Sequence, residues 1–347
     1  MNSKVLVTIL TYNSAAVIAE CLESLQKITY PVSDFKILII DNASTDNTLE
    51  IIKKNFPEVE IITNDKNLGF AGGNNIGFDF AAQNGFNYIY LLNDDTEVSP
   101  DFLTKAVEAM RSDHQAASVQ SKLLLHHDKS RINSIGNEIH YLGFGYAGGN
   151  GELDFEMDRR EITYASGASV LYDMSKITEV GVFNSEFFMY HEDLDIGWRI
   201  WLAGYKNILE PKSVVYHKYQ FLKSIKKFYF MERNRFLVVL QNYQLSTLVL
   251  LFPALVFIAI SMFFYSFLAG WWKEEFKVYK YFLNKQNLVK LMATRKSVQA
   301  KRKVPDREVI RRFVGEINFQ EKTGFFLKYL VNPVFGLYWK IIKVFIR

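Results

Sequence analysis

The chain has 347 residues, and its 49% hydrophobic and 22% charged composition excludes wholesale disorder and favours one large domain with an appendage. Its single cysteine, Cys21, excludes a disulfide framework and a cysteine-based zinc site, and is typical of a reducing compartment. We expect no signal peptide, because residues 1–4 lead directly into a short apolar run without a small-residue cleavage site.

The net charge of +4 conceals an asymmetry between two parts of the chain. Residues 1–220 hold 18 basic and 30 acidic residues, a net charge of −12, whereas residues 221–347 hold 23 basic and 7 acidic residues, a net charge of +16. This predicts an acidic domain over 1–220 and a basic region over 221–347 that meets an anionic partner. Because the basic region is also aromatic and apolar, a membrane surface explains it better than nucleic acid does.

Short apolar runs alternate with helical segments over the first hundred residues. The runs are rich in Ile, Val, Leu and Tyr and predict buried parallel strands at 5–12, 35–40, 59–62 and 88–92. The spacing between them predicts helices at 15–26, 45–55 and 74–84. Ser44 or Thr45 is the expected cap of the second helix, and Cys21 is expected in the core. This order predicts an α/β domain with a mostly parallel sheet, in which ligands bind at the carboxyl ends of the strands.

Residues 116–220 are less regular. Residues 132–147 and 162–172 resemble strands with glycine-rich turns, residues 193–203 predict a helix, and the acidic stretch 152–161 predicts a solvated loop.

Polar segments follow the first three predicted strands. Residues 11–14 contain no glycine, so the dinucleotide fingerprint is absent there, and no Walker A sequence occurs in the chain. Asp41, after the second strand, could accept hydrogen bonds from a ribose or a base, or cap a helix. The glycine-rich segment 67–77 predicts either backbone N–H groups that approach a phosphate or a tight turn.

Acidic and histidine side chains provide further candidates. Asp94 and Asp95 follow the fourth strand and could bind Mg²⁺ or Mn²⁺ with a nucleotide diphosphate, or form an exposed acidic turn. Asp193, in the sequence His-Glu-Asp, could supply a general base. His217 could be a metal ligand or a structural residue, and His126 is expected in a surface loop.

Together these segments resemble the inverting family-2 glycosyltransferases of GT-A fold, a Rossmann-like mixed sheet that binds nucleotide-diphospho-sugars. The resemblance covers about residues 4–220 and is carried by segments at 11–13, 41–46, 67–70, 93–95, 166–168, 191–193 and 217. Segment 67–77 is most similar to the branch that contains rhamnosyl- and galactofuranosyltransferases. Asn93 departs from the pattern, because many relatives carry a third aspartate there.

The resemblance assigns a role to each matching residue. It implies a catalytic base at Asp193, and metal ligands at Asp95 and at His217, which follows the base by 24 residues. It implies sugar and acceptor contacts from three residues, namely Gly167, Ala168 and Glu192. It implies nucleotide contacts from six residues, namely Thr11, Asn13, Asp41, Asn67, Gly72 and Asp94.

The function that follows is a metal-dependent, inverting hexosyl transfer. The donor would be a UDP-sugar or dTDP-rhamnose, the cofactor Mn²⁺ or Mg²⁺, and the acceptor a hydroxyl of a glycan, favoured to be lipid-linked, in cell-surface polysaccharide synthesis at the cytoplasmic face of the membrane. No nucleic-acid partner is expected, and homo-oligomerisation stays open. Two alternatives are a catalytically silent nucleotide-sugar-binding scaffold and a nucleotidyltransferase, whose glycine-rich basic signature is absent from residues 11–16.

The segment 247–272 is apolar and long enough to span a membrane. Basic residues flank it on both sides, however, and the positive-inside rule disfavours placing either flank outside. With Pro253 and Gly270 as places to bend, we predict a re-entrant or interface-lying helical pair, with 273–290 and 324–347 along anionic headgroups. The alternatives are a buried helix at an oligomer interface and a single span.

Overall fold

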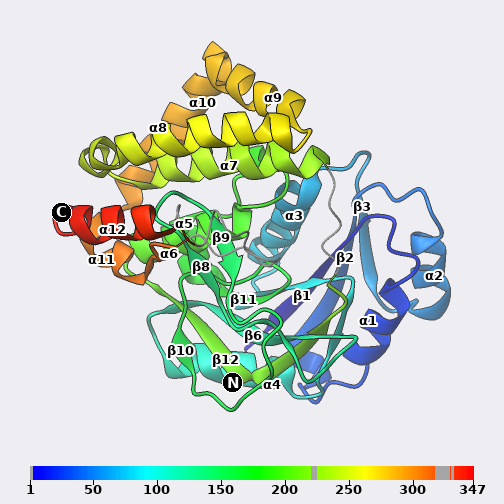
Figure 1. Cartoon of the computed structure of the whole chain (residues 1–347). Helices are drawn as coiled ribbons and strands as arrows, with labels where there is room; N and C mark the ends of the chain where they lie inside the picture. The colour runs from blue at the N-terminus through cyan, green and yellow to red at the C-terminus, as the bar shows by residue number, and fades with distance from the viewer. Residues whose placement is uncertain (1–2, 220–224, 317–328, 330–331) are drawn as a thin grey trace. The chain divides into compact units, whose positions relative to one another are not determined.

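The computed structural model describes residues 3–219, 225–316, 329 and 332–347 (Figure 1). The chain divides into two compact units. The first consists of Met1–Asn137, Ala147–Ile200 and Tyr205–Gln220, and the second of Glu138–Tyr146, Trp201–Gly204 and Phe221–Arg347. The sequence-based boundary at 220 stays a prediction, since the second unit also takes in two short segments before it.

A mixed sheet forms the centre of the first unit. Its strand order is β10-β12-β6-β11-β4-β1-β2-β3, with β5 paired to β12 and β7 to β6. Strands β1 to β4 are parallel, as the sequence predicts, whereas β11 runs antiparallel to both β4 and β6. The strands of this sheet are β1 Val5–Thr11, β2 Phe35–Asp41, β3 Glu60–Thr63, β4 Tyr88–Asn93, β5 Thr96–Val98, β6 Ala116–Leu125, β7 Ile132–Ser134, β10 Arg160–Glu161, β11 Ser169–Asp173 and β12 Lys206–His217.

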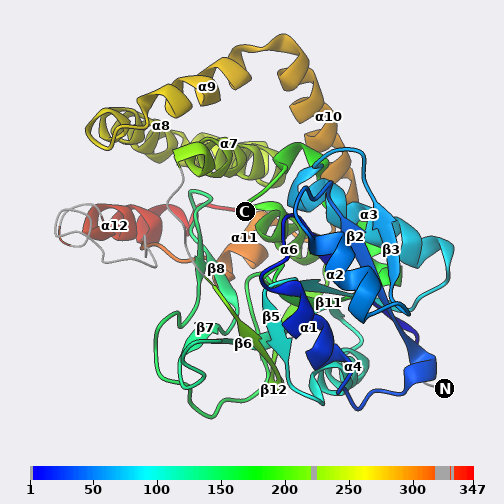
Figure 2. The same cartoon turned by 90° about the vertical axis from the view of Figure 1, so that its right-hand side faces the viewer.

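Helices cover both faces of this sheet (Figures 1 and 2). Apolar residues of α1, α2 and α4 form one core with the sheet, and Cys21 is fully buried in it, which confirms its predicted place. Helix α3 packs on β1, β2 and β4, away from that core. The helices of this part are α1 Ile18–Leu25, α2 Thr48–Asn55, α3 Gly69–Gln83, α4 Phe102–Ser112, α5 Met174–Val180 and α6 Glu192–Leu202, with 3-10 turns η1 Val32–Asp34 and η2 Ser185–Phe187.

Helix α3 begins five residues before the predicted start, so the glycine-rich segment is largely helical. An added Cβ at Gly77 would lie 2.8 Å from Thr8 Cγ2 and 3.2 Å from Ile40 Cδ1, and one at Gly73 would collide with Leu10. These two glycines therefore let the helix pack closely on β1 and β2. Packing outweighs the low helix propensity of glycine, which is why the sequence pattern placed the start too late.

The predicted strands with glycine-rich turns are present over 132–147 as three short strands, β7, β8 Asn137–Ile139 and β9 Gly145–Ala147, with positive φ angles at Gly136 and Gly143. Over 162–172 the strand is shorter than expected, since it begins at Ser169 after a turn at 166–169. One prediction needs correction: α2 begins after Asn47, and Asp46 Oδ1 accepts the Thr48 N–H (3.0 Å), so neither Ser44 nor Thr45 caps this helix.

The second unit is helical. It contains α7 Ile225–Asn242, α8 Leu245–Leu268, α9 Trp272–Leu283, α10 Lys285–Lys301, α11 Asp306–Val309, η3 Ile310–Arg312 and α12 Asn332–Ile342. Helix α8 is long and apolar enough to cross a membrane, and only 28% of its most apolar window is buried. Pro253 lies inside α8 without ending it, whereas Gly270 (φ +79°) lies in the turn that separates α8 from α9.

The first testable prediction concerns the start of α3, where Gly69 has φ +74°. An added Cβ there would collide with the backbone oxygen of Phe188, whereas Gly85, with φ +67°, has open space around the same position. We expect Gly85→Ala to lose about 1–2 kcal/mol of unfolding free energy through backbone strain alone. Gly69→Ala is expected to lose about 1–3 kcal/mol more through the collision. Denaturant unfolding of both variants checks this, and equal losses would contradict it.

Candidate active site

Polar side chains gather where β1 and β2 end. Thr11 and Asp41 are paired in register on neighbouring strands, and Thr11 Oγ1 donates a hydrogen bond of 3.0 Å to Asp41 Oδ1. Ser44 donates from its backbone N–H to Oδ2 (2.9 Å) and from its hydroxyl to Oδ1 (2.6 Å). Asp41 is only 1% exposed. The Asp41 carboxylate therefore stabilises the loop after β2. A ligand could bond only to the lone pairs of this carboxylate that Thr11 and Ser44 leave unused.

The loop after β1 is fastened to the loop after β2 through Asn13. Its backbone N–H donates to Ser44 Oγ (2.9 Å), and its side-chain oxygen accepts from the Thr45 N–H (2.8 Å). Asn13 has φ +56° and Ala43 has φ +65°, so both loops turn sharply at non-glycine residues. Asparagine takes this conformation more readily than most residues, which fits its position here.

Asn42 joins the loop after β3 to the loops after β1 and β2. Sequence reasoning missed this role. Its amide group donates to Asn67 Oδ1 (3.0 Å) and to the carbonyl of Gly69 (3.1 Å). Its oxygen accepts from the Leu68 N–H (3.0 Å). Asn42 is buried, so its hydrogen bonds are needed to offset its desolvation. The loops after β1, β2 and β3 thus form one connected surface, on which Thr11, Asn13, Asp41 and Asn67 all lie.

Asp94 and Asp95 occupy the turn between β4 and β5. Ser14 Oγ donates a short hydrogen bond to Asp94 Oδ2. Burial raises the pKa of Asp94 to about 6, and the neighbouring charge of Asp95 acts in the same direction. The two carboxylates are adjacent and only partly exposed, so a cation bound there would stabilise their charge.

His217 lies beside Asp95 because β5 pairs with the end of β12, in the register His217 to Thr96. The imidazole Nε2 is 3.1 Å from Asp95 Oδ1. Yet Nε2 is not aligned for a hydrogen bond, and this buried oxygen has no hydrogen-bond partner among the described residues. A carboxylate oxygen without a partner next to an imidazole nitrogen is a donor set that fits Mn²⁺ or Mg²⁺.

Asp193 lies in the first turn of α6, close to the turn at 166–168. Its carboxylate accepts hydrogen bonds from the backbone N–H groups of Gly167 (3.3 Å) and Leu194 (2.8 Å). Burial raises the pKa of Asp193 to about 6, although these two hydrogen bonds act in the opposite direction. Its neighbour Glu192 is buried, and burial raises the pKa of Glu192 well above its ordinary value.

The turn at 166–168 connects the two acidic groups. Its residue Gly167 bonds Asp193, and the carbonyl of the next residue, Ala168, accepts the N–H of Asn93, which precedes Asp94 (3.0 Å). An added Cβ at Gly167 would lie 3.0 Å from the ring of Phe70, so only a glycine leaves that ring in place. The sequence alone assigns no role to Phe70, because a lone aromatic residue carries no distinguishing signal.

The segment before Asp193 is strained. Phe188, Tyr190 and His191 have φ angles of +63°, +67° and +69°, which non-glycine residues rarely adopt. The carbonyl of Phe188 accepts the N–H of Ala71 in α3 (3.2 Å). Such strain persists only where the surroundings impose it, and it is concentrated at functional sites. Nothing in the sequence predicts it, because none of the three is a glycine or an asparagine.

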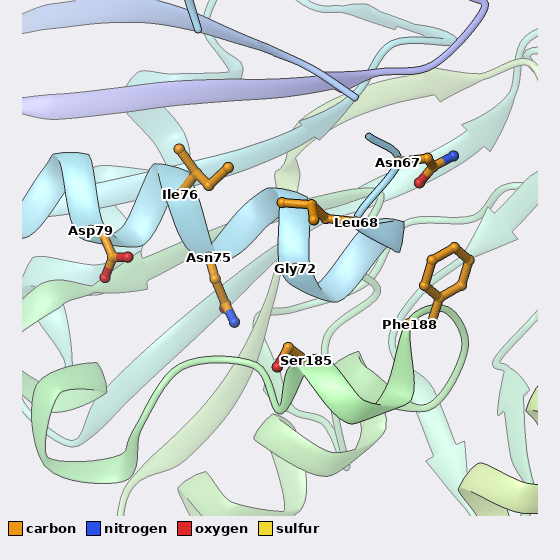
Figure 3. A pocket seen from close by; sticks show the side chains of 8 residues that line it. All are labelled: Asn67, Leu68, Gly72, Asn75, Ile76, Asp79, Ser185 and Phe188. Carbon is orange, nitrogen blue, oxygen red and sulfur yellow. The ribbon is translucent and has the colours of Figure 1, made fainter. Parts of the chain in front are cut away.

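A pocket of about 490 Å³ lies between α3 and the segment around η2 (Figure 3). Asn67 and Gly72 line it, so these two predicted nucleotide contacts share one cavity. The side chain of Asn75 points from α3 toward the segment that carries Ser185, and its amide donates to the Phe183 carbonyl (2.8 Å) (Figure 3). Gly72 is within α3, so its N–H belongs to the first turn of a helix and not to a free glycine-rich loop.

The structure also gathers Glu20, Glu97 and His126 closely enough to bind a metal ion. His126 Nε2 lies 2.8 Å from Glu20 and 3.4 Å from Glu97. However, Lys218 pairs with Glu20, and Lys129 pairs with Glu97 (2.7 Å). The lysines already compensate these carboxylates, so the cluster is a surface ion-pair network.

Comparison with known proteins gives a consistent picture. The family model described as glycosyl transferase family 2 matches residues 6–180, half of the chain. Poly-beta-1,6-N-acetyl-D-glucosamine synthase of Staphylococcus epidermidis is 26% identical over 207 residues, which cover 58% of this chain and 47% of that protein. N-acetylglucosaminyl-diphospho-decaprenol L-rhamnosyltransferase of Mycobacterium tuberculosis is 26% identical over 234 residues, covering 61% of this chain and 75% of that protein. The chain thus spans about half the length of the first of these relatives.

The fold is also found among solved structures. The mannosyltransferase PcManGT from Pyrobaculum calidifontis, determined in complex with GDP-Man and Mn²⁺, superposes with a TM-score of 0.52 and 15% identity. The match covers 87% of each chain. At this identity it supports the GT-A fold, and the sequence-based prediction of that fold is confirmed.

The second testable prediction concerns the pH dependence of folding stability. Because the folded-state pKa of Asp193 lies near 6 and its ordinary value is 3.8, the folded protein keeps this proton while the unfolded chain has lost it. Stability from this group is therefore complete below about pH 4 and is lost as pH rises through 6. Relative to wild type, Asp193→Asn should gain about 1–3 kcal/mol between pH 4 and 7. Thermal unfolding across this range checks it, and a difference that does not vary with pH would contradict it.

Proposed function

The chain belongs to glycosyl transferase family 2, and on that premise we propose that it transfers a sugar from a nucleotide-diphosphate donor to an acceptor hydroxyl, with inversion at the anomeric carbon. One observation carries the proposal: the turn at 166–168 links a carboxylate with a raised pKa, Asp193, to the Asp94–Asp95 turn. A single displacement requires a base and a diphosphate site near each other, and this short turn bonds to both acidic segments.

The wall formed by the loops after β1, β2 and β3 would hold the nucleotide. Thr11, Asn13 and Asp41 would lie around the base, Asn67 and Gly72 farther along the wall, and Asp94 near the ribose or the donor sugar. The hydrogen bonds within the wall support this, because they fix its shape before any ligand arrives, and a preorganised surface spends less free energy on ordering. A UDP- or dTDP-linked sugar, such as dTDP-rhamnose, is the proposed donor.

Asp95 and His217 would hold the divalent cation, Mn²⁺ or Mg²⁺. When bound, such a cation supplies positive charge to the diphosphate as it leaves. The support in this chain is the close approach of Nε2 and Oδ1 without an aligned hydrogen bond. Asp94 would remain on the nucleotide side of the same turn.

Asp193 would act as the general base. Its pKa near 6 leaves it ionised at neutral pH while it stays basic enough to accept a proton from a hydroxyl. The N–H groups of Gly167 and Leu194 hold the carboxylate in one orientation. Gly167, Ala168 and Glu192 would form the wall against which the acceptor lies, and the Phe70 ring closes this wall beside Gly167.

A glycan, favoured to be lipid-linked, is the proposed acceptor in cell-surface polysaccharide synthesis. The similar M. tuberculosis protein is named for transfer to a diphospho-decaprenol-linked sugar, which supports this class of acceptor. A catalytically silent binding module is disfavoured, because the raised pKa of Asp193 and the strained backbone before it are costs that a module without chemistry would not need.

The region 221–347 is proposed to lie on the cytoplasmic face of a membrane, with residues 1–220 as the catalytic domain. Helices α8 and α9 are joined by a turn at Gly270, which supports the proposed helical pair. Phe263 of α8 packs on Phe276 (5.7 Å between ring centroids) and on Tyr279 (6.0 Å) of α9. The Tyr279 hydroxyl also donates to the Ala259 carbonyl in α8 (3.3 Å).

This packing disfavours a full span of the membrane by α8. If α8 crossed the bilayer, α9 would be drawn into the hydrocarbon beside its second half, together with the exposed Lys273, Lys277 and Lys280. Charged side chains there cost several kcal/mol, about 2.5–3.5 each on insertion scales. An in-plane orientation lets these lysines meet anionic headgroups instead. The exposed apolar side chains of α8 and α12 would enter the acyl boundary, namely Val249, Phe252, Phe257, Ile260, Phe264, Val334, Leu337 and Ile341. Most of 317–331 lies outside the described residues.

The third testable prediction concerns the base. Asp193→Asn keeps the shape of the side chain and removes its basicity, so turnover should fall by about 10²–10⁴-fold while nucleotide binding persists. In wild type, kcat/KM should fall as pH drops below about 6, because the carboxylate takes up a proton. Sugar transfer from UDP- and dTDP-sugars measures this, with the exposed Asp158→Asn as the control. Near-normal turnover of Asp193→Asn would remove the assignment.

The fourth testable prediction concerns the membrane. In a Cys21→Ala background, single cysteines at Lys227 and Ser297 flank the α8–α9 pair on either side. An impermeant maleimide should label both from the cytoplasmic side of sealed vesicles and neither from the other side. Labelling of Ser297→Cys on the opposite face would establish a span. A protein that is soluble without detergent would favour a buried oligomer interface.

A further inference from the structure

Asn133 contacts His217 although the two residues are far apart in the sequence. Its side-chain oxygen lies 2.8 Å from His217 Nδ1, the nitrogen opposite the one that faces Asp95. Asn133 is only 4% exposed and His217 only 6%. A buried amide oxygen this close to a ring nitrogen accepts its proton, since leaving both groups unpaired would cost about 1–3 kcal/mol for each group.

A bulge in β7 aims Asn133 at the histidine. Leu123 and Leu124 of β6 pair with β7 on one edge of the strand and with β12 on the other, and Leu125 lies in register with His217. Leu123 pairs with Ser134 but Leu124 pairs with Ile132, so Asn133 is the extra residue between two pairs. Bulges next to active sites redirect a side chain in this way. The side chain of Asn133 therefore reaches across the face of β6.

We propose that Asn133 is a positioning residue for the cation site: it keeps the proton of His217 on Nδ1, so that Nε2 presents its lone pair beside Asp95. This inference rests on the proposed function, in which Asp95 and His217 hold the cation. Metal-bound histidines commonly donate their other ring N–H to an oxygen acceptor, and loss of that acceptor typically costs about 10–100-fold in metal affinity.

One further hydrogen bond and the geometry at Nε2 favour this tautomer over the alternative. The amide nitrogen of Asn133 donates to Asn150 Oδ1 (3.4 Å), which orients the oxygen of Asn133 toward the ring. In the other tautomer, Nε2 would carry the proton, but it is not aligned to donate to Asp95 Oδ1. The proton therefore forms a well-aligned hydrogen bond when it is on Nδ1, but not when it is on Nε2.

Three substitutions separate positioning from general stability. Asn133→Leu keeps the approximate volume and removes the acceptor. Asn133→Asp keeps an oxygen acceptor for the Nδ1 proton and should rescue the function. Asn137→Leu makes the same change at a nearby buried asparagine, which accepts from Ser134 Oγ (2.8 Å) and does not take part in the His217 contact. All are made in the full-length chain.

The first measurement is Mn²⁺ binding, followed by the paramagnetic resonance signal of the free ion. We expect Asn133→Leu to weaken binding about 10–100-fold, and Asn133→Asp and Asn137→Leu to stay close to wild type. The second measurement is the nitrogen spectrum of ¹⁵N-histidine-labelled protein without metal at mildly alkaline pH, with the His217 signals assigned through His217→Gln. We expect a proton on Nδ1 in wild type and a mixture of tautomers in Asn133→Leu.

The outcomes distinguish this inference from the function on which it rests. If wild type binds Mn²⁺ and Asn133→Leu binds it equally well, or if the wild-type proton is on Nε2, the positioning role of Asn133 is overturned and the proposed function stands. If wild type binds no Mn²⁺ while His217→Gln changes nothing, the cation site itself is overturned, and the positioning role with it.

Discussion

The pairing of β5 with the last residues of β12 is the constraint on which the site depends. It joins a turn at the end of β4 to a strand more than a hundred residues later, and it places a carboxylate and an imidazole 3.1 Å apart. The backbone extends the pairing, since the Lys218 N–H donates to the carbonyl of Asp95 (2.9 Å). On the other edge of β12, the His126 N–H that follows β6 donates to the carbonyl of His217 (2.9 Å). Strand pairing thus holds together two side chains that would otherwise separate in water. A metal ion or a nucleotide does not have to spend binding free energy on bringing them together.

The turn at 166–168 also holds acidic residues in place through its backbone. Two neighbouring backbone groups of this turn form hydrogen bonds to two acidic segments. Gly167 holds the carboxylate of Asp193, and Ala168 holds the strand end that carries Asp94. A shift of this turn would therefore move both carboxylates together. The strained residues at 188, 190 and 191 lie just before Asp193 in the chain, and the hydrogen bond between Phe188 and Ala71 ties this segment to α3. The carboxylate of Asp193 itself is held by two backbone N–H groups, those of Gly167 and Leu194, and not by flexible side chains.

The sequence predicts the strand ends and the acidic motifs well, because period and burial determine them locally. The prediction of Asp95 with His217 came from family resemblance, and the structure brings these residues together. Asn133 and Asn42 could not be predicted. Each is a single polar residue whose importance comes from a bulge or a loop crossing that appears only when distant strands align. The start of α3 was misplaced because its glycines pack against β1 and β2, and packing of this kind has no local signature.

The electrostatics of the site give a reason for this degree of confinement. Burial raises the pKa of both Asp94 and Asp193 to about 6, so at neutral pH each carboxylate is ionised at a cost to the fold. A flexible site would relax this cost by turning the carboxylates toward water or by binding lysines, as Glu20 and Glu97 do at the surface. The strand pairing, the glycine turn and the strained segment prevent that relaxation. In the proposed function, a bound cation or a proton taken from the acceptor would relieve this unfavourable free energy, and the binding of either would be favoured by the amount relieved.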